Sequence, residues 1–151
     1  MVYVLDQNGK PLMPTENHAK VRILLKTGRA KTIKSCPFTI QLLYDSTNYA
    51  QDISLGVDAG SKHIGLSATT ENKVLFESDI ELRNDIVDLL STRSQNRRSR
   101  RNRKTRYRKP RFNNRKRQDG WLAPSVQNKI DTHLTVVRKT HEILPITKIV
   151  V

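Results

Sequence analysis

The feature that most constrains this chain is the distribution of its positive charge. Between positions 92 and 118 there are 14 lysines or arginines and no acidic residue, while the other 14 basic residues cancel the 14 acidic ones. The whole formal net charge of +14 therefore lies in one segment. A helix that is basic on several faces cannot pack into a protein core, because burying unpaired charge is costly. Such a concentration of positive charge indicates a surface that binds a polyanion, because a surface that only keeps a protein soluble mixes positively and negatively charged residues.

Composition sets the broad class. A chain of 151 residues fits one or two small domains, and no apolar run approaches the ~18 residues of a membrane span. The first residues lack the basic, apolar and cleavage regions of a secretory signal, so we expect a cytoplasmic setting. The single cysteine, Cys36, cannot form an intrachain disulfide and has no zinc-ligand spacing to other residues; we expect it to be buried at the start of a strand.

Residues 1–48 read as a small α/β unit. Apolar and polar residues alternate over 2–6 and again over 38–44, which predicts two strands. Residues 7–11 have the composition of a turn. Residues 18–26 predict a helix with an apolar face, which Gly28 ends. Residues 46–48 have the composition of a linker.

A second unit follows from position 52. Residues 53–60, 62–70 and 73–82 predict three consecutive strands in an antiparallel meander, at 52–83. From position 84 the apolar residues recur at helical spacing, which opens the predicted basic-helix segment at 84–118. Within it we expect the helix to continue to Arg108, because Pro110 would end it. Residues 119–151 predict a helix opened by Pro124 and a short, buried apolar strand over 146–151. A core strand at the end of the chain suggests an originally longer polypeptide. The predicted core-facing stripe of this last helix consists of Val126, Ile130, Leu134, Val137, His141 and Leu144.

The basic helix supplies the candidate nucleic-acid-binding residues. Arginine binds phosphate bidentately and stacks on bases, and the aromatic side chains of Tyr107 and Phe112 can add stacking. One stripe is expected to hold Arg93, Arg97, Arg100, Arg101, Lys104 and Arg108, with Arg98, Arg103 and Arg106 on other faces. The full candidate set is Arg93, Arg97, Arg98, Arg100, Arg101, Arg103, Lys104, Arg106, Tyr107, Arg108, Lys109, Arg111, Arg115 and Arg117. A disordered basic tail is the alternative, and folded segments on both sides disfavour it.

Asp58 is the candidate catalytic and metal-binding residue. It ends a strand in which Ile53, Leu55 and Val57 alternate with polar or small residues, and glycines on both sides permit close approach of another group. A carboxylate on a core strand is costly to bury without a cation, and Mg²⁺ prefers carboxylate oxygen. From these neighbouring residues alone, an aspartate that stabilises a turn before Gly60 is the better interpretation, and the resemblance described next reverses that preference.

Five segments in order carry a resemblance to a known family. GVDAGSKHIG at 56–65 resembles a first RuvC motif, residues 97–101 match the RRXRR signature, and PLMP at 11–14 matches the motif that names the PLMP domain. With the segments at 106–112 and 120–125, the chain resembles the transposon-encoded IscB and IsrB proteins over essentially its full length.

The resemblance implies a specific architecture and function. It implies a PLMP domain at 1–48, the first part of an RNase H-like RuvC fold, and an arginine-rich bridge helix over Arg93 to Arg117. The implied protein is an RNA-guided, metal-dependent DNA endonuclease whose partners are a guide RNA, target DNA, and the remaining RuvC and HNH segments. Asp58 matches the metal-binding aspartate of the first RuvC segment, in a site that would hold Mg²⁺, two ions when complete.

The chain also departs from that family's pattern. The sequence contains no HNH motif, and the second RuvC glutamate would be expected within the next residue or two after Val151. One carboxylate cannot hold two metal ions, so we expect no DNA cleavage by this polypeptide alone. The alternatives are a stand-alone RNA-binding remnant without catalytic activity and a ribosomal-protein-like RNA binder. The latter explains the charge but neither the GVDAGSKHIG nor the PLMP segment.

Overall fold

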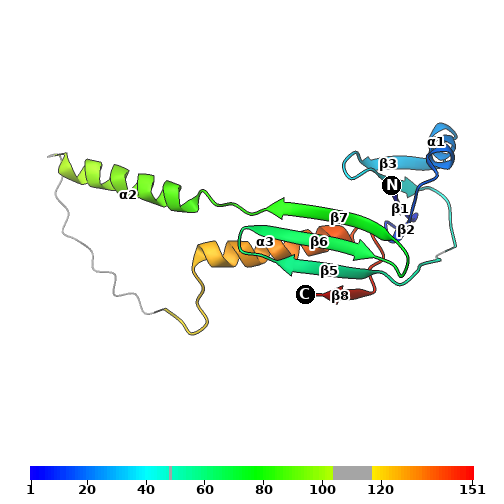
Figure 1. Ribbon diagram of the computed structural model, residues 1–151. Helices are drawn as coiled ribbons and strands as arrows, with labels where there is room; N and C mark the ends of the chain where they lie inside the picture. Colours follow the sequence, from blue (N-terminus) through cyan, green and yellow to red (C-terminus); the bar gives the residue numbers. More distant parts are fainter. Residues whose placement is uncertain (48, 104–116) are drawn as a thin grey trace.

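The computed structural model describes residues 1–47, 49–103 and 117–151. This part of the chain is a mixed α/β structure, with two four-stranded sheets and three helices (Figure 1). The first sheet has the strand order β2-β1-β4-β3, and the second has the order β7-β6-β5-β8. The predicted α/β class is confirmed. Among the described residues, no helix is both long and apolar enough to cross a membrane.

The first sheet contains β1 (Val2–Leu5), β2 (Pro11–Thr15), β3 (Ala30–Lys34) and β4 (Thr39–Leu42). Helix α1 (His18–Lys26) starts at Asn17, whose side chain accepts a hydrogen bond from the backbone of Lys20 at 2.9 Å. The predicted strand, helix and strand are β1, α1 and β4, whereas β2 and β3 were missed. Cys36 is exposed and precedes β4, so the expectation that it is buried was wrong.

The second sheet contains β5 (Ser54–Ala59), β6 (His63–Thr69), β7 (Val74–Glu81) and β8 (Lys148–Val150). Strands β5, β6 and β7 form the predicted antiparallel meander, and β8 pairs with β5 in parallel. Helix α3 (Pro124–His141) precedes β8. The strands at 52–83 and the segment at 119–151 therefore form one folded unit, with α2 between them in the sequence.

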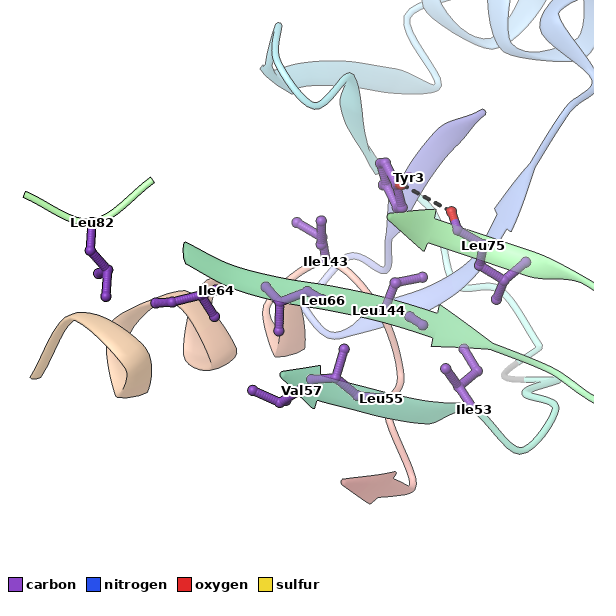
Figure 2. Close-up of a cluster of buried hydrophobic side chains, with 11 residues drawn as sticks. Tyr3, Ile53, Leu55, Val57, Ile64, Leu66, Leu75, Leu82, Ile143 and Leu144 are labelled. Carbon is purple, nitrogen blue, oxygen red and sulfur yellow. Dashed lines mark hydrogen bonds between the residues drawn. The ribbon is translucent and has the colours of Figure 1, made fainter. Parts of the chain in front are cut away.

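The core of the second unit lies on one face of its sheet. Alternation along β5 and β6 turns Leu55, Val57, Ile64 and Leu66 to this face, where Leu144 packs fully buried (Figure 2). Tyr3 from the first sheet is part of the same core cluster. Its hydroxyl donates a hydrogen bond of 3.1 Å to the carbonyl oxygen of Leu75, which ties the two units together (Figure 2).

Two expectations about this unit were wrong. In α3 the side chains of Val126, Ile130 and Leu134 are exposed, as is His141, because only the C-terminal part of the helix packs on the sheet. Strand β8 is exposed along its whole length rather than buried, because it lies at the edge of the sheet. Of the predicted stripe, Leu144 is buried and Val137 packs against the core.

Helix α2 (Ile86–Asn102) carries the first part of the basic segment. It ends earlier than predicted, since Arg103 has φ −71° and ψ 122° and is extended. No residue of α2 is buried, so packing does not stabilise its last turn, where closely spaced arginines repel one another. The rest of the predicted helix, from position 104 to 116, lies outside the described residues, and 117 and 118 are not helical.

Candidate nucleic-acid interface and carboxylate face

Residues 82–85, which lead into α2 and are called its root, are fixed to the second sheet. Leu82 is buried and its backbone N–H donates a hydrogen bond of 2.7 Å to the carbonyl oxygen of Lys62 in the β5–β6 turn. At the start of the helix, the guanidinium of Arg83 hydrogen-bonds the carboxylate of Asp85, and this contact lowers the pKa of Asp85. Beyond this root, α2 extends away from the sheet (Figure 1). The helix therefore presents its sides to solvent while its origin is held in place.

The described arginines of α2 are all exposed and several share one side. Arg93, Arg97 and Arg101 repeat every four residues and line a shallow groove of the helix surface. Arg98 lines the same groove, so its expected separation from this stripe was wrong. Arg100 is exposed but does not line this groove, although it was expected on the same stripe. The groove is therefore cationic along its length.

These arginines are available for an external anion. The ion pairs formed by the described residues involve Lys34, His63, Lys73 and Arg83, and none involves an arginine between positions 93 and 103. Guanidinium groups that lack an internal carboxylate and face solvent can bind phosphate without breaking an existing contact. This arrangement is what a polyanion-binding helix requires.

Part of the predicted interface lies outside the described residues. This holds for Lys104, Arg106, Tyr107, Arg108, Lys109, Arg111 and Arg115. Arg117 is exposed and its guanidinium carbon lies 3.9 Å from the ring centre of Trp121. Trp121 was not among the predicted binding residues, although its place directly after the basic segment could have drawn attention to it.

Asp58 lies at the end of β5, on the face of the second sheet that is opposite the core. Its side chain is exposed, so the expected cost of burying this carboxylate does not arise. Directly across from it on β6 stands Gly65, where an added Cβ would lie 3.4 Å from the Cβ of Asp58 and 4.0 Å from its Oδ2. The missing side chain at Gly65 leaves the carboxylate accessible from the middle of the sheet.

Two further carboxylates face the same side of the sheet. Asp79 on β7 pairs with Gly65, and Glu77 pairs with Ser67, the residue opposite Gly56. These residues line one open hollow of about 920 Å³ together with Asp58. Glu77, Asp79 and Glu81 alternate along β7, a period of two that could have identified this face from the sequence.

The fit of this face to a metal ion is partial. Asp58 and Asp79 are two strands apart, about 9 to 10 Å between Cα atoms, and Asp79 Oδ2 lies 3.3 Å from the Nδ1 atom of His63. Among the residues that the structure describes, no three carboxylate, imidazole or thiol groups converge on one point. Asp58 can supply one carboxylate ligand to such an ion.

The fold and the site define an α/β protein with a projecting cationic helix. A comparison with known protein families matches residues 2–151 to the family described as RRXRR protein. The chain belongs to this family, and the signature residues at 97–101 lie within α2. No individually curated protein matches the chain. Membership supports a nuclease-related, nucleic-acid-binding role.

Proposed function

We propose that this chain is the N-terminal part of an RNA-guided, metal-dependent DNA endonuclease of the IscB type, and that α2 holds the guide RNA. The observation that carries the proposal is the exposed arginine groove of α2, whose described arginines make no ion pair with protein carboxylates. Family membership over residues 2–151 supports it. Three antiparallel strands followed by a parallel strand are compatible with the beginning of an RNase H-like fold.

The geometry of α2 suits a phosphate backbone. A helix of 17 residues is about 25 Å long, and side chains four residues apart lie about 6 Å apart along its axis. Arg93, Arg97 and Arg101 can therefore contact successive phosphates of a strand that follows the groove. The contacts would be with the backbone, so the protein would accept different guide sequences.

Salt-dependent RNA binding tests this role. We compare the wild-type chain with the triple variant Arg93→Gln, Arg97→Gln, Arg101→Gln, using anisotropy of a fluorescently labelled single-stranded RNA. Log affinity falls with log salt, and each lost phosphate contact makes this slope less steep by about 0.7 to 0.9, so the slope of the triple variant should be less steep by about 2.

A charge-matched control separates the groove from net charge. Arg22, Lys26 and Lys139 are exposed and lie on α1 and α3, and replacing all three by glutamine removes the same charge. The control should keep nearly the wild-type slope. Equal slopes for the two triple variants would refute α2 as the RNA-binding element, and no RNA binding by the wild type would refute the proposed function.

The second part of the proposal assigns Asp58 as one ligand of a composite metal site. Because Val150 pairs with Gly56 in parallel register, a strand that continued β8 would place the position after Val151 opposite Asp58, on the same face. A glutamate there would bring two carboxylates to adjacent strands beside the gap at Gly65. When bound, Mg²⁺ would polarise the phosphodiester and activate the attacking water.

Metal binding can test this assignment without measuring cleavage. We would extend the chain after Val151 by either Glu-Gly-Ser or Gln-Gly-Ser and measure Mn²⁺ binding by electron paramagnetic resonance. The glutamate extension should bind Mn²⁺ more tightly than the glutamine extension, and Asp58→Asn should abolish the difference. If Asp58→Asn changes nothing, Asp58 is not a metal ligand. Tight RNA binding combined with that result would favour the stand-alone RNA-binding remnant.

A further inference from the structure

The turn that joins the basic segment to α3 holds an arginine against a tryptophan. The backbone N–H of Trp121 donates to the carbonyl oxygen of Gln118 at 3.1 Å, and Gly120 has φ +77°. A β-turn with a positive φ at its third residue is characteristic of glycine at that position. The turn places Arg117 and Trp121 on the same side, with the guanidinium carbon 3.9 Å from the ring centre.

The tryptophan ring remains accessible in this arrangement. Trp121 is 45% exposed, and its neighbour Leu122 is equally exposed. Tryptophan is usually well buried, because its large apolar surface makes exposure costly. A cation over the ring recovers only about 0.5 to 1 kcal/mol at an exposed site. Helix α3 begins three residues later at Pro124, so the turn is attached to a regular element.

The chemistry of this pair fits an unpaired nucleobase. Aromatic rings and guanidinium planes both stack on exposed bases, and Arg117 also provides charge for a phosphate. Arg117 is the last basic residue of the segment between positions 92 and 118, which has 14 basic and no acidic residues, and Trp121 lies three residues beyond that segment. This charge favours a polyanion as the partner that reaches the pair. An acidic protein would satisfy the charge but would not require a planar aromatic surface.

We propose that Arg117 and Trp121 form a stacking platform for one unpaired base of the nucleic acid bound by α2, either RNA or single-stranded DNA. The inference rests on the proposed nucleic-acid-binding function and adds a base-contacting site to it. Stacking does not require a particular base, so the platform would select single-stranded over paired nucleotides rather than a sequence.

Intrinsic fluorescence tests the platform directly, because Trp121 is the only tryptophan in the chain. We titrate the wild-type protein with a single-stranded RNA, the same sequence as single-stranded DNA, the RNA duplex, and inorganic polyphosphate. Single-stranded RNA or DNA should quench the emission at saturation. Polyphosphate should bind and compete but leave the emission nearly unchanged, since it has no base to stack.

Substitutions provide a second measurement. Trp121→Leu should weaken single-stranded RNA binding about tenfold, and Trp121→Phe should recover most of the loss because a ring is retained. The control is Arg29→Gln, which breaks the other cation–π contact among the described residues, in which the guanidinium carbon lies 4.4 Å from the ring centre of Tyr44. It should leave both affinity and quenching at wild-type values.

The outcomes separate this inference from the function on which it rests. If RNA binds with the expected dependence on Arg93, Arg97 and Arg101 but neither quenches Trp121 nor responds to Trp121→Leu, the platform is refuted and the proposed function stands. Equal quenching by polyphosphate would also refute base stacking. If no nucleic acid binds, the proposed function itself is refuted.

Discussion

Gly60 directly follows β5 and allows the geometry at the Asp58 end of the sheet to be tested. A Cβ added at Gly60 would clash with the backbone carbonyl oxygen of His63 and would lie 3.4 Å from its carbonyl carbon. A backbone oxygen cannot rotate away as a side chain can, so the β5–β6 turn would have to shift. At Gly56, four residues earlier, the nearest atom to an added Cβ is the backbone oxygen of Ser67 at 3.7 Å, an ordinary contact.

The two glycines therefore form a matched pair for the same substitution. The shift needed to accommodate an added methyl group in packed structure costs about 1 to 3 kcal/mol. We therefore expect Gly60→Ala to lower the free energy of unfolding by about that amount. Gly56→Ala should be neutral or raise it by about 0.5 to 1 kcal/mol, because glycine inside a strand is destabilising relative to alanine. The two variants should therefore differ by about 1 to 4 kcal/mol in the free energy of unfolding.

Urea denaturation followed by circular dichroism at neutral pH measures this difference. The same turn supplies the Lys62 carbonyl that accepts the backbone hydrogen bond of Leu82, so Gly60→Ala should also loosen the root of α2. Hydrogen exchange at Leu82 reports that effect. Equal stabilities of Gly60→Ala and Gly56→Ala would refute the close approach of the chain at this turn.

Three other substitutions test the contacts between and within the units. Tyr3→Phe should lower the free energy of unfolding by about 1 kcal/mol through loss of the bond to Leu75, measured by urea denaturation. Burial raises the pKa of Tyr3 above 10.0, so the wild type, unlike the variant, should lose stability as pH rises beyond that value. The contact with Lys73, 2.7 Å away, lowers the pKa of Glu16, so the stability difference between wild type and Glu16→Gln should be fully present above pH 4.5 and shrink as the pH falls. Ser78→Ala should leave stability unchanged or raise it by about 1 kcal/mol, because the buried Ser78 hydroxyl has no hydrogen-bond partner among the described residues.

The antiparallel meander was predictable from the sequence, whereas two strands of the first sheet were not. Strand β2 contains Pro11 and Pro14, which lack a backbone N–H and usually argue against a strand. The strand forms because β2 lies at the sheet edge, where a missing donor can face away from the neighbouring strand. Strand β3 is also an edge strand, and its lysines obscure the apolar alternation that identifies strands.

The helical spacing of apolar residues predicted where α3 lies but not how much of it is buried. Val126, Ile130 and Leu134 recur at helical spacing, which tells which side of the helix is apolar. It does not tell whether another element covers that side, and in this structure the sheet covers only the C-terminal part. The same limit applies at Asp58, since its place at a strand end was predictable but its alignment with Asp79 depends on strand register.

The two parts of the candidate site act in opposite ways on a phosphate, because the arginines of α2 attract it and the carboxylates of Asp58 and Asp79 repel it. The end of the sheet that holds Asp58 also holds the root of α2, because His63 pairs with Glu81 and the backbone of Leu82 bonds to Lys62. Phosphates attracted by the arginines of α2 would meet the carboxylates of Asp58 and Asp79 as they approach that end. These charges repel phosphate within roughly the 8 to 10 Å over which physiological salt screens them. A divalent cation beside Asp58 would reverse the sign of that interaction, so in the proposed enzyme the metal would serve to admit the nucleic-acid backbone as well as to activate it.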